Sequence, residues 1–425
     1  METTNTAKII TVVGARPNFM KAAPIIAAIR EHNERLGSDE SSFPLQNVLV
    51  HTGQHYDQAM SERFFLDLNI PKPDVHLGVG SGSHAVQTAE VMKRFEEVLV
   101  RERPDLLIVV GDVNSTIGCA LVASKIAFDS SGTRPLIAHV EAGLRSFDRA
   151  MPEEINRIVT DHLADLLFVT EDSGSSNLRD EGVSGDKIHF VGNTMIDSLL
   201  AFKDRANQSD ILQQLNLRDG NLSNGTARYG LLTLHRPSNV DQRSTLLNIL
   251  EGLEYLSSSC PVIFPVHPRT RKRISEFGLE NFFETGSVSD SPSRPHAQAN
   301  GRIRLVEPLG YLDFLCMMAH ASVVVTDSGG IQEETTCLGV PCVTVRENTE
   351  RPVTVKVGTN ILAGTSKEGI RAATRRALTS EVSGAVPEAW DGRSAQRIVS
   401  IIAREIGNKR SQRSVLEMAD STRAR

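Results

Sequence analysis

The sequence predicts an α/β protein made of two doubly wound, Rossmann-like domains that face each other across a cleft. Short apolar runs without polar alternation recur along the chain and are separated by helical patterns, which is typical of parallel sheets covered on both faces. The alternation stops near 198–228, where DGNLSNGTARYG has a linker composition, and then starts again. Because ligands bind outside the carboxyl ends of such strands, we expect a site where the two sets of strand ends meet.

Each apolar run is short enough for a strand, and the runs between them have the length and spacing of helices. The expected strands of the first half are 8–14, 45–51, 105–111, 135–140, 165–170 and 187–192, with helices at 21–36, 83–103 and 114–128. The expected strands of the second half are 229–235, 261–267, 302–306, 322–327 and 341–345.

These elements divide the chain into three parts. An N-terminal Rossmann-like domain is expected over 1–205 and a C-terminal one over 206–385. The remainder, 386–425, is expected to hold a helix at 394–405 that packs back on the first domain, followed by a flexible tail. The segment 285–301 is rich in Ser, Pro and Asn and predicts a mobile surface loop.

Composition excludes several classes of function. Hydrophobic residues are 40% and charged residues 23% of the 425, as in soluble globular proteins. The net charge of −6 and the lack of a basic stripe argue against nucleic acid as a partner. No apolar run approaches the roughly 18 residues of a membrane span, and METTNTAK lacks a signal-peptide core, so a cytoplasmic protein is expected. The five cysteines lack metal-ligand spacing, and no metal is expected.

Most of the unusual polar residues directly follow expected strands. In VVGARPNFMKAAP (12–24), Arg16 and Lys21 follow the first strand, and a guanidinium and an ammonium group both suit a diphosphate. The alternative is a pair of solvated cations near a helix start. The segment is not a P-loop, because it lacks the Gly-Lys-Ser/Thr ending.

A second stretch of this kind is SVVVTDSGGIQEET (322–335). A buried strand ends there at Ser328, Gly329 and Gly330, and a helix starts. Free backbone N–H groups at a helix start favour an anion, and glycines allow a phosphate to approach closely. Glu334, about one turn later, is placed to accept hydrogen bonds from ribose hydroxyls. The alternative is a helix N-cap followed by acidic residues.

Two histidines end expected strands of the second half. His235 follows LLTL and His267 follows VIFPV, and each has an arginine close behind it. Such histidines could hold phosphate oxygens or donate a proton to a leaving group, although a lone histidine is more often structural.

Carboxylates gather after two strands of the first half. Asp112 directly follows 105–111, where it either caps the next helix or acts in catalysis. Glu141 follows 135–140 in HVEAGLRSFDRAMPEEINR (139–157). Pro152, Glu153 and Glu154 form a helix start in which acidic residues are favoured by the helix dipole. Asp112, Glu141 and one first-turn glutamate could converge and divide acid and base roles.

The motifs together resemble the non-hydrolysing UDP-N-acetylglucosamine 2-epimerases. They occur in the family's order over 14–360 and are GARPNFMKAAP, TGQHYD, GDVNST, HVEAGLR, MPEEINR, GNTMID, HRPSN, PVHPR, TDSGGIQEE and TERPVTVKVGTN. The resemblance implies a fold like that of the B-type glycosyltransferases, a homodimer, and interconversion of UDP-N-acetylglucosamine and UDP-N-acetylmannosamine for polysaccharide synthesis without an external cofactor.

The resemblance also implies a role for particular residues. UDP would be eliminated across C1–C2 to give 2-acetamidoglucal and would add back after C2 is reprotonated on the other face. The acid/base group would be Asp112, Glu141 and Glu153, with His235 stabilising the departing phosphate. The residues that would hold UDP are Arg16, Lys21, His235, Ser328, Gly329, Gly330, Glu334 and Arg351, and the segment 307–314, which ends at Phe314, would contact the uracil.

Three departures from the family pattern bear on specificity. Tyr56 replaces an arginine after Gln54 and His55, and Pro237-Ser238 replace Arg-Glu; both changes lie at or near a second, activating sugar-nucleotide site, so we expect that activation to be absent. Asn18 replaces a glutamate, which leaves a modified UDP-sugar open as substrate. Further alternatives are a hydrolysing epimerase, a retaining glycosyltransferase and a non-catalytic protein that binds a UDP-sugar.

Overall fold

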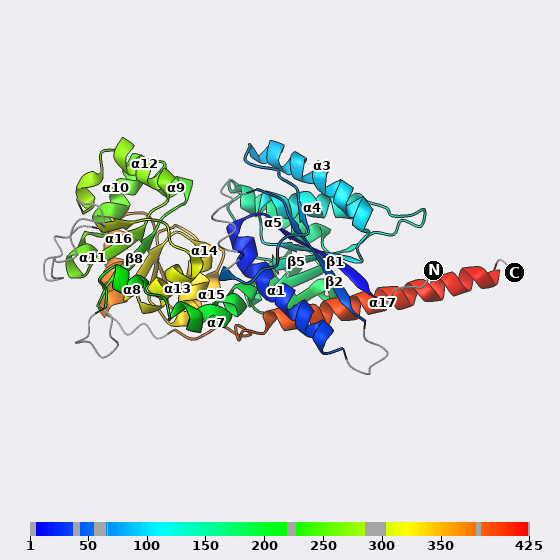
Figure 1. The fold of residues 1–425 in the computed structure, drawn as a ribbon. Coiled ribbons are helices and arrows are strands. Elements are labelled where there is room, and N and C mark those ends of the chain that lie inside the picture. Colours follow the sequence, from blue (N-terminus) through cyan, green and yellow to red (C-terminus); the bar gives the residue numbers. More distant parts are fainter. Residues whose placement is uncertain are drawn as a thin grey trace. The chain divides into compact units, whose positions relative to one another are not determined.

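A computed structural model describes residues 6–36, 43–54, 65, 67–218, 227–284, 303–379 and 384–423, without the side chains of Arg16 and of residues 413–423. The segment 285–301, where a loop was expected, lies outside this range. The chain divides into two units, Met1–Ser198 with Glu388–Arg425 (unit 1) and Leu199–Pro387 (unit 2). Each unit carries its own parallel sheet with helices (Figure 1), which confirms the α/β, doubly wound class. The domain limits expected after 205 and after 385 stay predictions.

Unit 1 contains a seven-stranded sheet in the order β3-β2-β1-β4-β5-β6-β7, and the described pairs are all parallel. The chain therefore starts near the middle of the sheet, at β1. It adds β2 and β3 on one side of β1 and then β4 to β7 on the other side, so the strand order switches between β1 and β4, as in a Rossmann fold. Its strands are β1 (Ala7–Val13), β2 (Leu45–His51), β3 (Val75–His76), β4 (Leu106–Val110), β5 (Leu136–Ala142), β6 (Leu166–Val169) and β7 (Ile188–Phe190).

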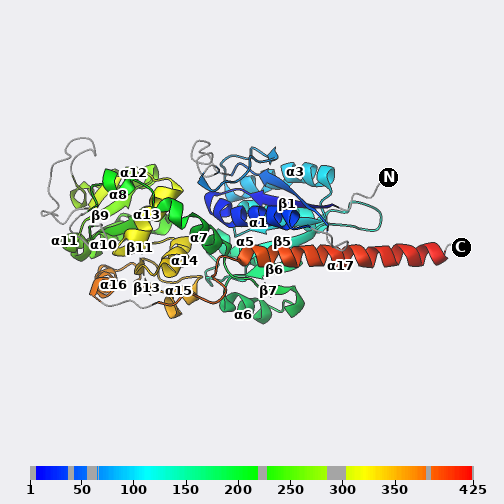
Figure 2. The same cartoon turned by 60° about the horizontal axis from the view of Figure 1, so that its bottom comes forward.

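Helices cover both faces of this sheet. One apolar core lies between the sheet and helices α3 and α4, and the other lies between the sheet and helices α1 and α17. Figure 2 shows α17 running alongside α1 on that second face. The helices are α1 (Arg16–Glu34), α3 (His84–Glu102), α4 (Asn114–Lys125), α5 (Pro152–Leu163), α6 (Asp172–Asp180), α7 (Thr194–Ala206), which continues into unit 2, and α17 (Ser394–Arg423).

Unit 2 repeats this topology with six strands in the order β10-β9-β8-β11-β12-β13. Its strands are β8 (Gly230–Thr233), β9 (Val262–Pro265), β10 (Ile303–Val306), β11 (Val323–Thr326), β12 (Cys342–Thr344) and β13 (Asn360–Leu362). Its helices are α8 (Ile211–Gln214), α9 (Pro237–Val240), α10 (Arg243–Gly252), α11 (Glu254–Ser259), α12 (Pro268–Glu276), α13 (Tyr311–His320), α14 (Gly329–Leu338), α15 (Pro352–Lys356) and α16 (Lys367–Thr379).

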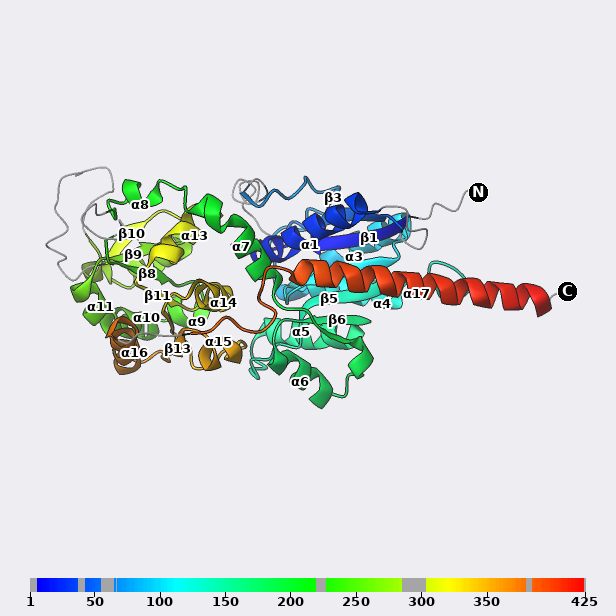
Figure 3. The same ribbon diagram turned by 90° about the horizontal axis from the view of Figure 1, so that it is seen from below.

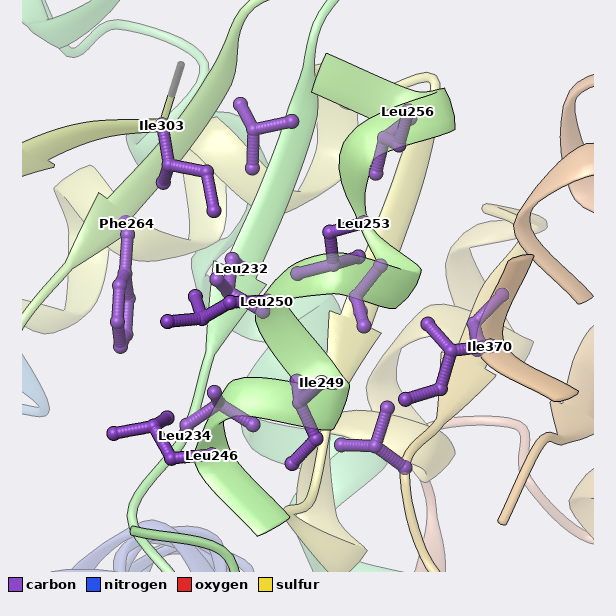
Figure 4. Close-up of a cluster of buried hydrophobic side chains, with 14 of the residues drawn as sticks. Leu232, Leu234, Leu246, Ile249, Leu250, Leu253, Leu256, Phe264, Ile303 and Ile370 are labelled. Carbon is purple, nitrogen blue, oxygen red and sulfur yellow. The ribbon is translucent and has the colours of Figure 1, made fainter. Parts of the chain in front are cut away.

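The core of unit 2 is made of branched aliphatic side chains. Leu246, Ile249 and Leu250 project from one face of α10 onto Leu232 and Phe264 of the sheet (Figure 4). All five are at most 1% exposed. Burying each such side chain contributes about 1.5–3 kcal/mol. This core holds the strands that present the polar residues described below.

Most expected elements are present, and the differences have local causes. Helix α1 begins at Arg16 instead of residue 21, because Pro17 fits the first turn of a helix. The strands β3 and β13 were not expected from the sequence, since two or three residues are too short to show a period. The segment after 407, expected to be loosely ordered, is helical as far as Arg423, and it contains no proline.

The start of α17 is attached to the rest of unit 1 by Asp197. This carboxylate is 5% exposed and accepts hydrogen bonds from the N–H groups of Ser394 (3.2 Å) and Ala395 (2.7 Å). The first N–H groups of a helix have no partner inside the helix, so Asp197 satisfies two of them. Ile398 and Ile402 then pack into the core shared with α1.

We predict that Asp197→Ala lowers the free energy of unfolding by about 1–2 kcal/mol, because the first turn of α17 loses its cap. Urea denaturation measures this change. Asp391→Ala is a matched control, since Asp391 also accepts a backbone N–H, from Arg393, but its side chain is 47% exposed. The control should change stability by less than about 0.5 kcal/mol. Equal losses in the two variants would contradict the assigned role.

Candidate functional site

The carboxyl ends of β1, β4 and β5, which are neighbours in the sheet, bring four residues of unit 1 together. Gly111 follows β4 in left-handed backbone, with φ 68°. A Cβ atom added at Gly111 would lie 3.3 Å from Glu141 Oε2, 3.6 Å from Asn18 Nδ2 and 3.6 Å from Lys21 Nζ. The backbone angle favours glycine here, and the polar side chains of Glu141, Asn18 and Lys21 all lie close to this turn.

Glu141 has an unusual backbone. Its φ is 72°, and the pairing of β5 with β6 shifts register between Val140 and Ala142. A left-handed conformation costs a residue other than glycine of the order of 1–3 kcal/mol and is concentrated at functional sites. The carboxylate forms a buried ion pair with Lys21. Lys21, predicted to hold UDP, thus lies beside a predicted acid/base residue.

Asp112 is held by an arginine from another element. Its carboxylate forms an ion pair with Arg157 of α5, which also binds Glu154 at 2.7 Å. Asp112 remains 28% exposed at its side chain, whereas Arg157 is 4% exposed. Val113 occupies the N-cap position of α4, so Asp112 lies one residue before it.

The structure distinguishes the two glutamates of the MPEE motif. Glu154 is buried and accepts hydrogen bonds from the N–H groups of Ser146 and Phe147, in addition to its ion pair with Arg157. Glu154 therefore supports the loop after β5. Glu153 is half-buried in the first turn of α5. Its acid/base role stays a prediction.

Asn18 has a structural role. Its Oδ1 accepts hydrogen bonds from the N–H groups of Gly14 (3.1 Å) and Ala15 (3.0 Å), and its Nδ2 donates to the carbonyl of Val110 (2.9 Å). The side chain is buried and fastens the turn after β1 to the end of β4. These contacts give the residue a structural role, and its effect on the choice of sugar stays a prediction.

In unit 2, the start of α14 combines a helix N-terminus with a guanidinium group. Ser328 is the N-cap residue and forms no side-chain cap, and Gly329 and Gly330 are the first helical residues. A Cβ atom at Gly329 would lie 2.6 Å from Nη1 of Arg351, so only glycine leaves room for this contact. The helix dipole and the arginine both favour an anion at this place.

Arg351 belongs to a buried group of charges. It lies 2.9 Å from Glu333 and 2.9 Å from Glu350, while Glu350 also contacts Arg346 at 2.8 Å and Arg236 at 3.5 Å. Burial alone would raise the pKa of Glu350, but Arg351 and Arg346 outweigh it and hold that pKa well below its usual range. Three arginines and two glutamates thus share one buried cluster, and Asp327 borders it through Arg236.

Glu334 follows Glu333 in α14, and its side chain is buried, with 4% of the residue exposed. Burial, with a smaller contribution from Glu333, raises the pKa of Glu334 to about 8. Its Oε1 atom has no hydrogen-bond partner among the described residues. Burial and the nearby Glu334 raise the pKa of Tyr311 well above its usual value. The predicted ribose acceptor thus lies close to the start of α13, where Phe314 is half-buried.

His235 is paired with a buried aspartate. Its Nδ1 lies 2.9 Å from Asp327 Oδ1, and its side chain is 59% exposed. Asp327 also accepts the N–H groups of His235 and Arg236. Burial alone would raise the pKa of Asp327, but its hydrogen bond with His235 and that residue's charge help to lower it. The carboxylate therefore orients the imidazole. His267, in contrast, accepts the N–H of Arg269 as the N-cap of α12.

Several predictions are not addressed by these contacts. The side chain of Arg16 and the residues His55 and Tyr56 lie outside the part of the chain that is described. Within the described part, no group of three or more His, Cys, Asp or Glu side chains is placed to hold a metal ion. The described helices also include none that is long and apolar enough to cross a membrane.

Arg157 and Asp327 were not identified from the sequence as members of the site. Asp327 directly follows β11, and Asp112 lies two residues after β4. This position at the end of a strand is the sequence feature that could have identified Asp327. Arg157 follows Glu154 by three residues, which places both on one face of α5. Both residues are buried, which the local sequence pattern does not indicate.

Comparisons with known proteins agree on one family. Residues 39–403 match the profile of the UDP-N-acetylglucosamine 2-epimerases. The UDP-N-acetylglucosamine 2-epimerase of Methanocaldococcus jannaschii is 40% identical over 401 residues, which are 93% of this chain and 98% of that protein. A UDP-2,3-diacetamido-2,3-dideoxy-D-glucuronate 2-epimerase of Pseudomonas aeruginosa is 36% identical over 93% of this chain and 99% of its own length.

A solved structure shows the same fold. The M. jannaschii UDP-N-acetylglucosamine 2-epimerase, crystallised in complex with UDP-N-acetylglucosamine and UDP, superimposes with a TM-score of 0.78 at 39% identity. The match covers 93% of this chain and 99% of that one. With a family profile over most of its length and relatives of this identity, the chain belongs to the UDP-N-acetylglucosamine 2-epimerase family of isomerases.

Proposed function

We propose that the protein epimerises UDP-N-acetylglucosamine at C2 to UDP-N-acetylmannosamine without hydrolysing it, and that the product supplies polysaccharide synthesis. The observation that carries the proposal is the pair of carboxylates Asp112 and Glu141. Asp112 follows β4 and Glu141 lies near the carboxyl end of the neighbouring strand β5, and each is held by a cation, Arg157 and Lys21 respectively. Proton transfer at a sugar carbon requires acid/base groups held in place in this way.

The C2 proton of the sugar is not acidic by itself, so an elimination is the reasonable route. A carboxylate takes the C2 proton, the C2–H electrons form the C1=C2 double bond, and the C1–O bond breaks with its electrons leaving on UDP. A proton then returns to C2 on the other face, and UDP adds back to C1. Asp112, Glu141 and Glu153 are the proposed acid/base group, and no external cofactor is needed.

The charges of unit 2 suit the UDP portion. The start of α14 and Arg351 would bind the diphosphate, because both present donors to an anion. His235, oriented by Asp327, would donate a hydrogen bond to the departing phosphate. Glu334 would pair with ribose hydroxyls and so satisfy its buried oxygen. Arg16 and Phe314 are kept as proposed UDP contacts, and we expect a homodimer in the cytoplasm.

A second candidate is epimerisation of a modified UDP-sugar. A relative that is 36% identical is a 2-epimerase of a diacetamido glucuronate nucleotide. This finding supports the candidate, and so does the asparagine at position 18, where other members of the family carry a glutamate.

We predict that UDP-N-acetylglucosamine in heavy water gains deuterium at C2 while a UDP-N-acetylmannosamine signal appears in the proton NMR spectrum. Release of free N-acetylmannosamine and UDP would instead establish a hydrolysing enzyme. If neither occurs but the diacetamido glucuronate nucleotide exchanges its C2 proton, the second candidate is correct. A protein inactive on both would overturn the proposal.

We predict that Asp112→Asn, Glu141→Gln and Glu153→Gln each lower kcat by at least about a hundredfold, because each removes an acid/base group. UDP affinity, measured by calorimetry, should change little, since the proposed diphosphate ligands are intact. Glu31→Gln is a control of the same chemistry at an exposed surface ion pair and should leave kcat unchanged. Any of the three variants with near-normal kcat would lose its assigned role.

We predict a pH-dependent gain in stability for Glu334→Gln. The raised pKa means that folded wild-type protein keeps the proton of Glu334 while the unfolded chain releases it, so stability falls as pH rises from about 4.5 to about 8. Glutamine does not ionise, so the variant does not lose stability in this way. In urea denaturation, the free energy of unfolding of Glu334→Gln relative to the wild type should therefore increase from about pH 4.5 to about pH 8. Glu350→Gln is the matched control: its pKa is lowered, so the variant should be destabilised at pH 7.

The UDP affinity of Glu334→Ala should fall about fivefold to a hundredfold at pH 7, because the ribose loses a hydrogen bond to a buried group. The pH prediction for Glu334→Gln has a separate counter-outcome. If Glu334→Gln and Glu350→Gln are equally destabilised at pH 8, ionisation of Glu334 does not lower the free energy of unfolding of the wild type. Unchanged UDP affinity of Glu334→Ala would remove the residue from the proposed site.

A further inference from the structure

His139 is a fully buried histidine in the middle of β5, and both of its ring nitrogens face acceptors. Its Nε2 lies 2.8 Å from the carbonyl oxygen of Gly111, and its Nδ1 lies 2.6 Å from Oδ1 of Asp161 on α5. A carbonyl oxygen only accepts, so Nε2 must carry a proton. Whether Nδ1 also carries one depends on the charge of Asp161.

Asp161 is a carboxylate with several donors around it. Its Oδ2 accepts the N–H of Gly143 at 3.1 Å and contacts Nη1 of Arg145 at 2.7 Å. Burial alone would raise the pKa of Asp161, but His139 and Arg145 outweigh burial and lower it. Nδ1 of His139 and Oδ1 of Asp161 therefore share a hydrogen bond, and the ring is held at both of its nitrogens.

The contacts of this pair continue inside the fold. Arg145 makes two hydrogen bonds of 2.7 Å to Glu181, so a connected set of polar contacts runs from His139 through Asp161 and Arg145 to Glu181. A buried ion pair of this kind is weak evidence for stability, since desolvation offsets most of its attraction. The contact between His139 and Asp161 is better explained as one that fixes a single geometry of the surrounding turns.

The pair holds the two turns that present the proposed acid/base carboxylates. Gly111, directly before Asp112, accepts the His139 hydrogen bond and donates its own N–H to the carbonyl of Val140 at 3.0 Å. Gly143, two residues after Glu141, donates to Asp161. The turns are left-handed at Gly111 (φ 68°), Glu141 (φ 72°) and Gly143 (φ 79°), so they depend on such contacts to keep their shape.

We propose that His139 and Asp161 are positioning residues that set the orientation of Asp112 and Glu141 for proton transfer. The proposal rests on the function proposed above. β5 lies between β4 and β6 in the sheet, and Figure 3 shows β5 beside β6. The imidazole of His139 therefore reaches the end of β4, while its partner Asp161 comes from α5, the helix that follows β5. Neither residue needs to contact the substrate.

Two substitutions separate the hydrogen bonds of His139. The amide of His139→Gln can reach the place of Nε2 and donate to Gly111, whereas the shorter amide of His139→Asn can replace only Nδ1 and its bond to Asp161. We expect kcat to fall about a hundredfold in His139→Asn and about tenfold or less in His139→Gln, since misplacing catalytic groups by about 1 Å costs on the order of a hundredfold. KM should change less than about threefold in both.

Asp165→Asn is the matched control for a general loss of stability. Asp165 also accepts a backbone N–H of β5, from Ile137, and also binds an arginine, Arg134, through two hydrogen bonds of 2.8 Å. It precedes β6 and thus lies at the opposite end of the sheet. Its variant should lose stability and keep its kcat.

Histidine side-chain NMR tests the hydrogen bond from His139 to Gly111 without any substrate. In protein labelled with ¹⁵N at histidine, one ring should carry a proton on Nε2 that exchanges slowly with water, and this signal should disappear in His139→Gln. A His139 ring without a proton on Nε2 would overturn this hydrogen bond.

The positioning role would be overturned if the wild type epimerises its nucleotide while His139→Asn keeps normal kcat, or if Asp165→Asn loses as much kcat as His139→Asn. A wild type without C2 exchange would instead refute the proposed function, and the NMR result would still decide the hydrogen bond.

Discussion

Parallel strands end at a single edge of their sheet, and the rest of this molecule depends on that constraint. Every residue that directly follows β1, β4 and β5 is brought to the same edge, where backbone must turn sharply and polar groups accumulate. At Gly111 and Glu141 the turn is left-handed, which brings the Glu141 carboxylate beside Gly111 and Lys21. The same edge of the second sheet brings Asp327 and the start of α14 together with His235.

Buried charges at these edges lie against charges of the opposite sign. Glu141 with Lys21, Asp112 with Arg157, and Glu350 with three arginines are all held by contacts within one unit. Such groups cost desolvation energy and require good geometry to repay it, so they specify a shape more than they add stability. Glu334 is the exception, because its unpaired oxygen and raised pKa leave it to be satisfied by a ligand.

Helix α5 shows where local reasoning from sequence fails. Its charged residues Glu154, Arg157 and Asp161 are at most 3% exposed, whereas Ile155 is 39% exposed. An amphipathic reading would bury the isoleucine and expose the charges. The tertiary structure reverses this pattern because the loop after β5 and the end of β4 offer backbone N–H groups, an aspartate and a histidine that satisfy the charges.

The sequence by itself determined the α/β class, most strand positions and the family, because apolar runs and strand-end motifs are local patterns that survive without coordinates. It also located Asp112, Glu141, His235 and Glu334 at strand ends or helix starts. Only the tertiary structure decided that Lys21 pairs with Glu141, that Asn18 fastens a turn, and that His139 bridges Gly111 and Asp161. Each of these contacts except that of Asn18 with its own turn joins residues at least 20 positions apart, and no periodicity in a sequence records which distant side chains will share a hydrogen bond.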